Sequence, residues 1–211
     1  MNILSNFVAI SLFFISTNLQ AANYCGELKS SYGPFDYTDS ESRPSDSKYL
    51  VEMAHFTPDV EHLIKGNTGS IGGDLAYTLA VFPNHHRALI ALGKLAIRDK
   101  NIHPYGLRFS VDCYFDRAIR FKAKDGMVRM VYGIYLSQSG NLEKAIEQMD
   151  EAVNFLPENA TVNYNAGLLH FKKKNYADAR KYAKKAYALG FPLPGLRKSL
   201  TEVGKWDEPA E

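Results

Sequence analysis

The sequence has almost no excess of charge of either sign, because 25 Lys and Arg residues stand against 23 Asp and Glu residues. A nucleic-acid-binding domain usually carries a basic surface with a clear net charge, so this composition argues against a nucleic-acid partner. The densest basic stretch, residues 172–185, comes after an acidic stretch at 143–151. If the two segments form neighbouring helices, their charges screen one another.

Long apolar runs are scarce as well. Only residues 3–16 form an extended apolar run, which is shorter than the roughly twenty residues needed to span a bilayer. The run is followed by Leu19-Gln20-Ala21, whose small last residue suits cleavage of an export signal. We therefore predict a signal peptide at residues 1–21, a periplasmic or secreted mature protein, and no stable membrane insertion after cleavage. A retained membrane anchor is the alternative.

Cysteine is nearly absent, with Cys25 and Cys113 as its two occurrences. No C-x-x-C motif and no paired histidine spacing accompanies them, so the sequence predicts no zinc site and no other metal site. In an exported chain an even number of cysteines favours pairing. A Cys25–Cys113 bond would close a long loop, a restraint worth about 4–5 kcal/mol in the chain-entropy model. Two unrelated thiols are the alternative.

Small residues recur in the second half of the chain with a spacing of thirty-four residues, the sign of a stacked two-helix repeat. A small residue in the first helix and alanines in the second allow the two helices of a unit to approach closely, and a proline ends the unit. The recurring residues are Gly133, Ala145, Ala152 and Pro157, followed by Gly167, Ala179, Ala186 and, one place late, Pro192.

This pattern resembles the tetratricopeptide repeat family, and the resemblance implies an all-α fold, an α-solenoid of about three helix pairs with capping helices. The same register, followed toward the N-terminus, places a longer first unit before Gly126, with its surplus residues in the turn around 99–110. The expected divisions are an irregular segment at 22–73 with a short helix, an array at 74–203 with units 86–125, 126–159 and 160–193, and a tail at 204–211.

Local signals predict the elements outside the three units. Residues 49–56 alternate weakly and are expected to be extended, and Pro58 is expected to begin a short helix that ends at Ile64. Asp74 is a candidate cap for a helix at 75–82 that packs on the first unit. Pro194-Gly195 precedes a short amphipathic segment suited to closing the open end of the array.

The resemblance also implies where a partner would bind, because the family's ligand-facing side chains lie on the first helices. The middle of this surface is apolar and aromatic, its ends are basic, and it lacks the Lys/Asn pattern that clamps a C-terminal carboxylate in some members. An alternative is that residues 23–71 fold back and fill this surface. The expected groove residues are Ile90, Lys94, Met130, Ile134, Tyr164, Leu168, Phe171 and Lys172.

Residues 23–86 hold the candidates for chemistry. The glycines between 66 and 73 lack the Gly-Lys-Ser/Thr ending of a nucleotide-binding loop. Acidic and histidine side chains could gather around a metal, but adjacent histidines on a helix point about 100 degrees apart. These ligand candidates are Glu52, His55, Glu61, His62, His85 and His86.

The sequence therefore predicts a non-catalytic protein that binds a protein or peptide partner in the cell envelope, with no catalytic residue and no cofactor. The rival hypothesis is a hydrolase-like or metal-dependent enzyme with its site in the N-terminal segment. Convergence of Glu52, His55 and His62 in a pocket away from the array would favour the enzyme.

Overall fold

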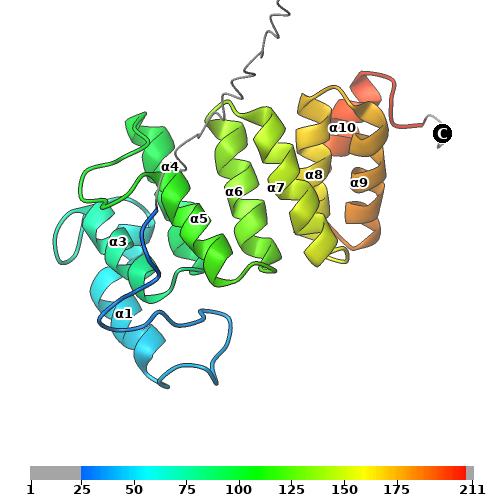
Figure 1. Cartoon of the computed structure of the whole chain (residues 1–211). Helices are drawn as coiled ribbons and strands as arrows, with labels where there is room; N and C mark the ends of the chain where they lie inside the picture. The colour runs from blue at the N-terminus through cyan, green and yellow to red at the C-terminus, as the bar shows by residue number, and fades with distance from the viewer. Residues whose placement is uncertain (1–24, 208–211) are drawn as a thin grey trace, which may run out of the picture.

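The computed structural model describes residues 25–207, and its regular elements there are all helices, stacked side by side from α4 to α9 (Figure 1). The expected all-α solenoid is therefore confirmed. The predicted signal peptide lies outside the described residues. The helices are α1 (Ser47–His55), α2 (Pro58–Glu61), α3 (Ile71–Val81), α4 (His86–Asp99), α5 (Val111–Phe121), α6 (Gly126–Gln138), α7 (Leu142–Phe155), α8 (Ala160–Lys172), α9 (Tyr176–Ala188) and α10 (Gly195–Glu202).

Three helix pairs form the centre of the molecule. The pairs α4–α5, α6–α7 and α8–α9 fall within the three units expected from the sequence. The first helices α4, α6 and α8 pack on one another in turn, and α5 and α7 each contact the first helix of the next pair. The first two pairs and α8 bury one core, and α8, α9 and α10 bury a second cluster at the C-terminal end of the stack.

Glycine and alanine set the distance between the two helices of a pair. A Cβ at Gly133 would lie 3.0 Å from the carbonyl oxygen of Ala145, and one at Gly167 would lie 3.1 Å from that of Ala179. Both alanines are fully buried. Gly93 has a different neighbour, since it faces α6 of the next pair and not its own partner α5. In the first pair the small residue therefore serves the contact between units.

Polar caps and left-handed turns divide the chain into these short helices. Each cap residue of α6 to α9 accepts hydrogen bonds from backbone N–H groups of the first turn. Gly140 ends the α6–α7 turn with φ at 92°, and Lys174 takes the same left-handed conformation in the α8–α9 turn with φ at 64°. A lysine there carries a steric cost of about 1 kcal/mol that glycine avoids. The caps are Asp125, Asn141, Asn159 and Asn175.

The expectation that residues 49–56 are extended is wrong, because they belong to α1. This helix packs on α3 and buries Val51, while Tyr49, Leu50 and Met53 stay exposed. Only one face of a short helix is covered here, so its apolar residues do not show a clear helical period. The helix that begins at Pro58 is shorter than expected, ending at Glu61.

The start of α3 also differs from the expectation. The helix begins at Ile71, where the Ser70 hydroxyl accepts a hydrogen bond from the Gly73 N–H at 3.0 Å. Asp74 lies inside the helix and is buried. Its carboxylate accepts hydrogen bonds from the backbone of Asn67 and Thr68, so it holds the preceding loop in place and does not cap the helix.

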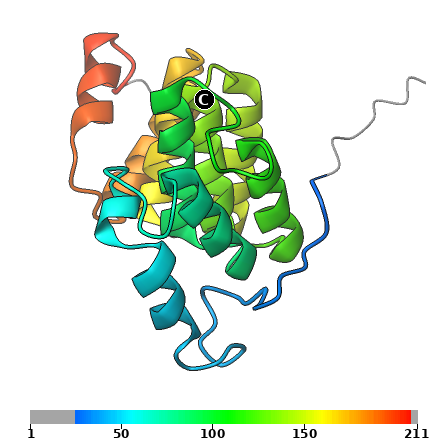
Figure 2. The ribbon, with the colours of Figure 1, turned by 90° about the vertical axis from the view of Figure 1, so that its left-hand side faces the viewer.

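The N-terminal segment crosses the outer side of the array before it reaches α1 (Figure 2). Cys25 is joined to Cys113 on α5 through a disulfide that closes a loop with a sequence separation of 88. Further along, the backbone N–H of Phe35 donates to the carbonyl of Val81 at 2.8 Å. The two cysteines expected to pair are thus at disulfide distance, and the bond fastens residues 25–37 to the second helices.

Candidate interaction groove

A hollow of about 230 Å³ lies between the first helices of the first two pairs. We call it the α4–α6 groove. Its floor is mainly apolar, and a lysine, a glutamine and a tyrosine supply its polar side-chain atoms. The residues that line it are Leu89, Ile90, Gly93, Lys94, Met130, Val131, Ile134, Tyr135 and Gln138.

Four of the expected groove residues meet in this hollow. Met130 is 5% exposed and forms part of the floor, whereas Ile90 is 38% exposed and stands at the edge. Ile134 is half-buried beside Met130, and Lys94 is exposed. The helical register read from the sequence therefore placed these four side chains together.

The other four expected residues do not continue this surface. Tyr164 is 9% exposed, because its ring stacks on Phe191 with the centroids 4.0 Å apart. Its hydroxyl oxygen accepts a hydrogen bond from the backbone N–H of Leu196 at 3.3 Å. The chain's own C-terminal part, from the end of α9 through α10, therefore covers Tyr164. The expected groove surface on the first helices is interrupted there.

The neighbours of Tyr164 on α8 have separate environments. Phe171 packs against the ring of Tyr176, and the Lys172 ammonium donates a hydrogen bond to the carbonyl of Ser137 at 2.9 Å. Leu168 is 39% exposed and lies outside the lining of the α4–α6 groove. The α4 and α6 part of the predicted site is thus a formed hollow, and the α8 residues lie outside its lining.

The N-terminal segment borders the groove without lining it. Arg87 on α4 forms an ion pair with Glu61, and the Arg98 guanidinium donates to the carbonyl of Leu63 at 2.8 Å. Glu61 and Leu63 line an adjoining hollow of about 210 Å³, which shares Ile90 and Lys94 with the groove. Residues 57–63 therefore form one wall beside α4, and the surface between α4 and α6 stays uncovered within residues 25–207.

The charges around the α4–α6 groove are not balanced. Within residues 25–207, Lys94 makes no ion pair, whereas Arg87 and Arg98 have Glu61 and Asp99 as partners. Tyr135 is a neutral donor at physiological pH, because burial and then the nearby Asp112 carboxylate raise its pKa to about 12. The groove thus combines an apolar floor with one uncompensated cation at its edge.

The candidate metal ligands of the N-terminal part are separated into pairs. The His85 ring bonds to Glu52 and the His55 ring to Asp74, each at 3.0 Å, while His62 contacts a backbone carbonyl on the surface. No group of three ligands capable of holding a metal ion occurs within the part of the chain that the structure describes. Glu52, His55 and His62 do not share a pocket.

Comparison with known proteins agrees with the helix pairs. A family model described as a tetratricopeptide repeat matches residues 133–190, the range from mid-α6 to the end of α9. Residues 133–190 are thus similar to tetratricopeptide repeats. A search of curated proteins gives no match. One similar solved structure carries a title on the functional characterization of PilF from Pseudomonas aeruginosa. The two structures have a TM-score of 0.53 and 19% sequence identity, and the match covers 75% of this chain and 68% of that chain. At this identity the similarity concerns the fold alone.

Outside the matched range, a buried polar network attaches the N-terminal segment to the first helix pair. Asn84 is fully buried, and its amide donates to Asp36 at 2.8 Å and to Asp125 at 3.2 Å. Its oxygen accepts from the backbone N–H of Tyr37, whose ring lies 4.0 Å from that of His85. Sequence reasoning missed this role, although the cluster of polar residues directly after Pro83 was a signal for it.

His85 and His86 both have a structural role in this network. The backbone N–H of Ala88 donates to Nδ1 of His85, so Nε2 carries the proton and donates to Glu52. Burial lowers the pKa of His85, which keeps the ring neutral. His86 contacts both carboxylate oxygens of Asp125 at 3.0 Å. Both side chains therefore help to hold the segment in place at the first helix pair.

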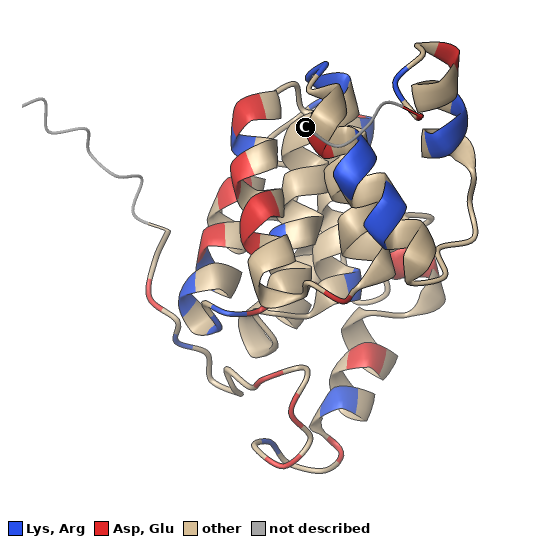
Figure 3. Cartoon of the chain, turned by 90° about the vertical axis from the view of Figure 1, so that its right-hand side faces the viewer, with Lys and Arg blue, Asp and Glu red and all other residues tan. Residues whose placement is uncertain are grey.

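The charged faces of the last two helix pairs lie on neighbouring second helices, acidic on α7 and basic on α9 (Figure 3). Lys173 pairs with Glu143, and Lys185 pairs with Glu158 at 2.7 Å. Part of the predicted mutual screening is therefore present.

Within residues 25–207, no helix is both long enough and apolar enough to cross a membrane.

Proposed function

We propose that the protein is a non-catalytic scaffold that binds another protein through the α4–α6 groove. The observation that carries this proposal is the hollow itself, an apolar floor on the first helices with nothing from residues 25–207 over it. First helices of stacked repeats form the extended surfaces with which such proteins bind their partners. A few buried apolar anchors usually supply most of the affinity at a site of this kind.

The partner is a peptide segment with an apolar side chain next to a carboxylate. The apolar side chain fits the floor made by Met130 and Ile134, and the carboxylate fits Lys94. Charge complementarity supports this choice, because Lys94 is the groove cation without an ion-pair partner among residues 25–207.

Site-specific photo-crosslinking tests the proposal. A photoreactive amino acid is placed at Ile90, on the groove edge, and at Glu147, an exposed position on α7. We expect the Ile90 position to give a discrete adduct whose crosslinked peptide has an apolar residue beside Asp or Glu. The Glu147 position serves as the matched control and should not give that adduct.

Titration of the identified peptide then separates its two contacts. Lys94→Gln should weaken binding by about tenfold and flatten its salt dependence, because the exposed ion pair is lost. Equal adducts from both positions, or a bound peptide without a carboxylate, would contradict the proposed partner chemistry.

We further propose that the mature protein acts in the cell envelope after removal of residues 1–21. The two cysteines at disulfide distance support this location, because disulfides persist in oxidising compartments. Intact-mass measurement of the exported protein should show cleavage after Ala21 or Ala22. A full-length mass in the membrane fraction would contradict it.

A further inference from the structure

A second hollow, of about 470 Å³, lies on the outer side of the array beside the disulfide. Segment 26–29, the end of α3 and the stretch from Arg108 to Arg117 enclose it. Two guanidinium groups, those of Arg108 and Arg117, each lie 5.2 Å from the centroid of the Phe109 ring. Both cations are thus held against one aromatic side chain at the same hollow.

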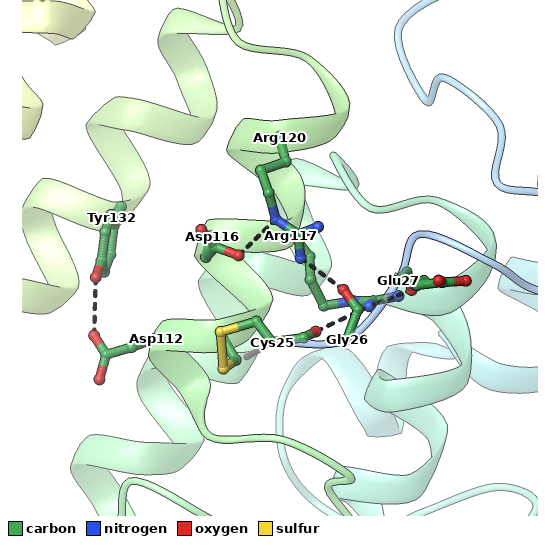
Figure 4. Close-up of a disulfide and its surroundings, with 9 residues drawn as sticks. Cys25, Gly26, Glu27, Asp112, Asp116, Arg117, Arg120 and Tyr132 are labelled. Carbon is green, nitrogen blue, oxygen red and sulfur yellow. Dashed lines mark hydrogen bonds and ion pairs between the residues drawn. A yellow bond between two sulfur atoms is a disulfide. The ribbon is translucent and has the colours of Figure 1, made fainter. Parts of the chain in front are cut away.

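Arg117 is the main polar group of this hollow. It is 5% exposed, and its Nη1 donates to the carbonyl oxygens of Cys25 at 3.1 Å and of Glu27 at 2.7 Å (Figure 4). Within residues 25–207, its Nε and Nη2 make no hydrogen bond, and neither atom is fully shielded from solvent. The N–H groups on these two atoms therefore remain available to a ligand in the hollow.

The surrounding charges leave this site positive. Asp116 pairs with Arg120 at 2.7 Å, and Glu27 pairs with Lys29 at 2.5 Å. Among the described residues, Arg108 and Arg117 have no carboxylate partner. Burial, together with the nearby cations Arg120 and Arg108, lowers the pKa of Arg117. An unpaired cation with so little contact with water is costly unless an anion accompanies it.

Tyr114 adds a neutral donor to the same hollow. Its hydroxyl oxygen accepts a hydrogen bond from the backbone N–H of Arg108 at 3.3 Å, so its own proton is free to donate. Burial raises the pKa of Tyr114, and the hydroxyl therefore stays protonated at neutral pH. Two guanidinium groups that have no carboxylate partner among the described residues, together with one hydroxyl donor, match an oxyanion of charge near −2.

We propose that this hollow, the arginine pocket, binds a phosphate group through Arg108, Arg117 and Tyr114. The group belongs either to a soluble phosphate or to the headgroup of an anionic lipid, and the pocket chemistry is the same for both. The arginine pocket and the α4–α6 groove share no lining residue, so occupation of the pocket leaves the groove accessible.

Calorimetric titration of the disulfide-bonded mature chain with inorganic phosphate, against chloride at equal ionic strength, tests the proposal. We expect saturable binding that Arg108→Gln weakens by at least about tenfold, because a charged hydrogen-bond donor is removed. Arg108 is exposed, so this variant should fold normally. Tyr114→Phe, which keeps the ring, should also weaken binding. Lys124→Gln removes one exposed charge elsewhere and should leave binding unchanged.

Phosphatidylcholine vesicles with and without phosphatidic acid identify the source of the phosphate. If the protein is retained on the vesicles with phosphatidic acid and inorganic phosphate releases it, the ligand is the lipid headgroup. If the protein binds free phosphate but is not retained on these vesicles, the ligand is a soluble phosphate. Either result supports the pocket. A heat of binding no greater than with chloride would overturn the proposal. A loss of phosphate affinity in Lys124→Gln equal to that in Arg108→Gln would also overturn it, because it would show a general charge effect.

Discussion

Truncation of Tyr164 should detach the C-terminal end of the array. In Tyr164→Ala the stack on Phe191 and the hydrogen bond to the Leu196 N–H are both lost. Leu196 and Leu200, which are fully buried, would then face a cavity. Replacing a buried aromatic side chain by alanine typically costs about 3–5 kcal/mol. We expect a loss of about 3–4 kcal/mol in the free energy of unfolding.

Two further variants divide this loss into its parts. Tyr164→Phe keeps the ring and removes only the hydroxyl, so we expect a loss of about 1 kcal/mol. Leu168→Ala shortens a side chain that is 39% exposed on the same helix, and we expect a loss below about 1 kcal/mol. The difference between the alanine variants measures the packing of α10 and the preceding loop on α8.

Urea unfolding followed by two signals is the assay. Trp206 is the single tryptophan of the chain, and it packs against Tyr187 in the C-terminal cluster. Its fluorescence reports this end, while circular dichroism reports all helices. In Tyr164→Ala the fluorescence transition should precede the loss of helix signal. Coincident transitions together with a loss under about 1 kcal/mol would refute the docking of α10 on Tyr164.

Three other features of the chain give testable expectations. Replacing Cys25 and Cys113 by serine should lower the free energy of unfolding by about 4–5 kcal/mol in the chain-entropy model, and neither thiol of the native protein should react with an alkylating reagent before reduction. Both Lys174 and Gly140 have left-handed backbone conformations. Lys174→Gly should therefore raise the free energy of unfolding by up to about 1 kcal/mol and raise the thermal midpoint slightly, whereas Gly140→Ala should lower both. Burial tends to raise the pKa of Asp36, but hydrogen bonds from Lys122 and neighbouring donors outweigh it and lower that pKa. The contribution of Asp36 to stability is therefore present above about pH 4 and is lost as the pH falls below it. Asp36→Asn should flatten the acid side of a pH–stability curve, and an unchanged curve would contradict this.

The repeated part of the fold could be predicted from the sequence because its determinants are local and periodic. Gly133 and Gly167 each mark a close helix contact, and Asn141 and Asn175 each begin a second helix. The register that follows from these residues also placed Ile90 beside Ile134. A thirty-four-residue period carries this information in the spacing alone.

The remaining features depend on contacts between distant parts of the chain. Tyr164 has the register of a groove residue, but the choice between an exposed and a covered ring depends on where the chain turns after α9. Asn84 binds residues 36 and 37 across a long loop, and Arg117 binds carbonyls near Cys25 that only the folded chain brings within reach. The polar cluster after Pro83 indicates a special role for Asn84, but no local pattern identifies the partners of Asn84 or Arg117.

The affinity of the crosslinked peptide for Ile134→Asp tests the account most directly. This change places a carboxylate on the floor of the α4–α6 groove and should weaken binding by about 30-fold or more, since an unpaired charge would be buried on binding. Leu168→Asp, on α8 outside the groove, should bind within about twofold of the unmodified protein. Equal affinities for the two variants would contradict the assignment of the groove as the binding surface.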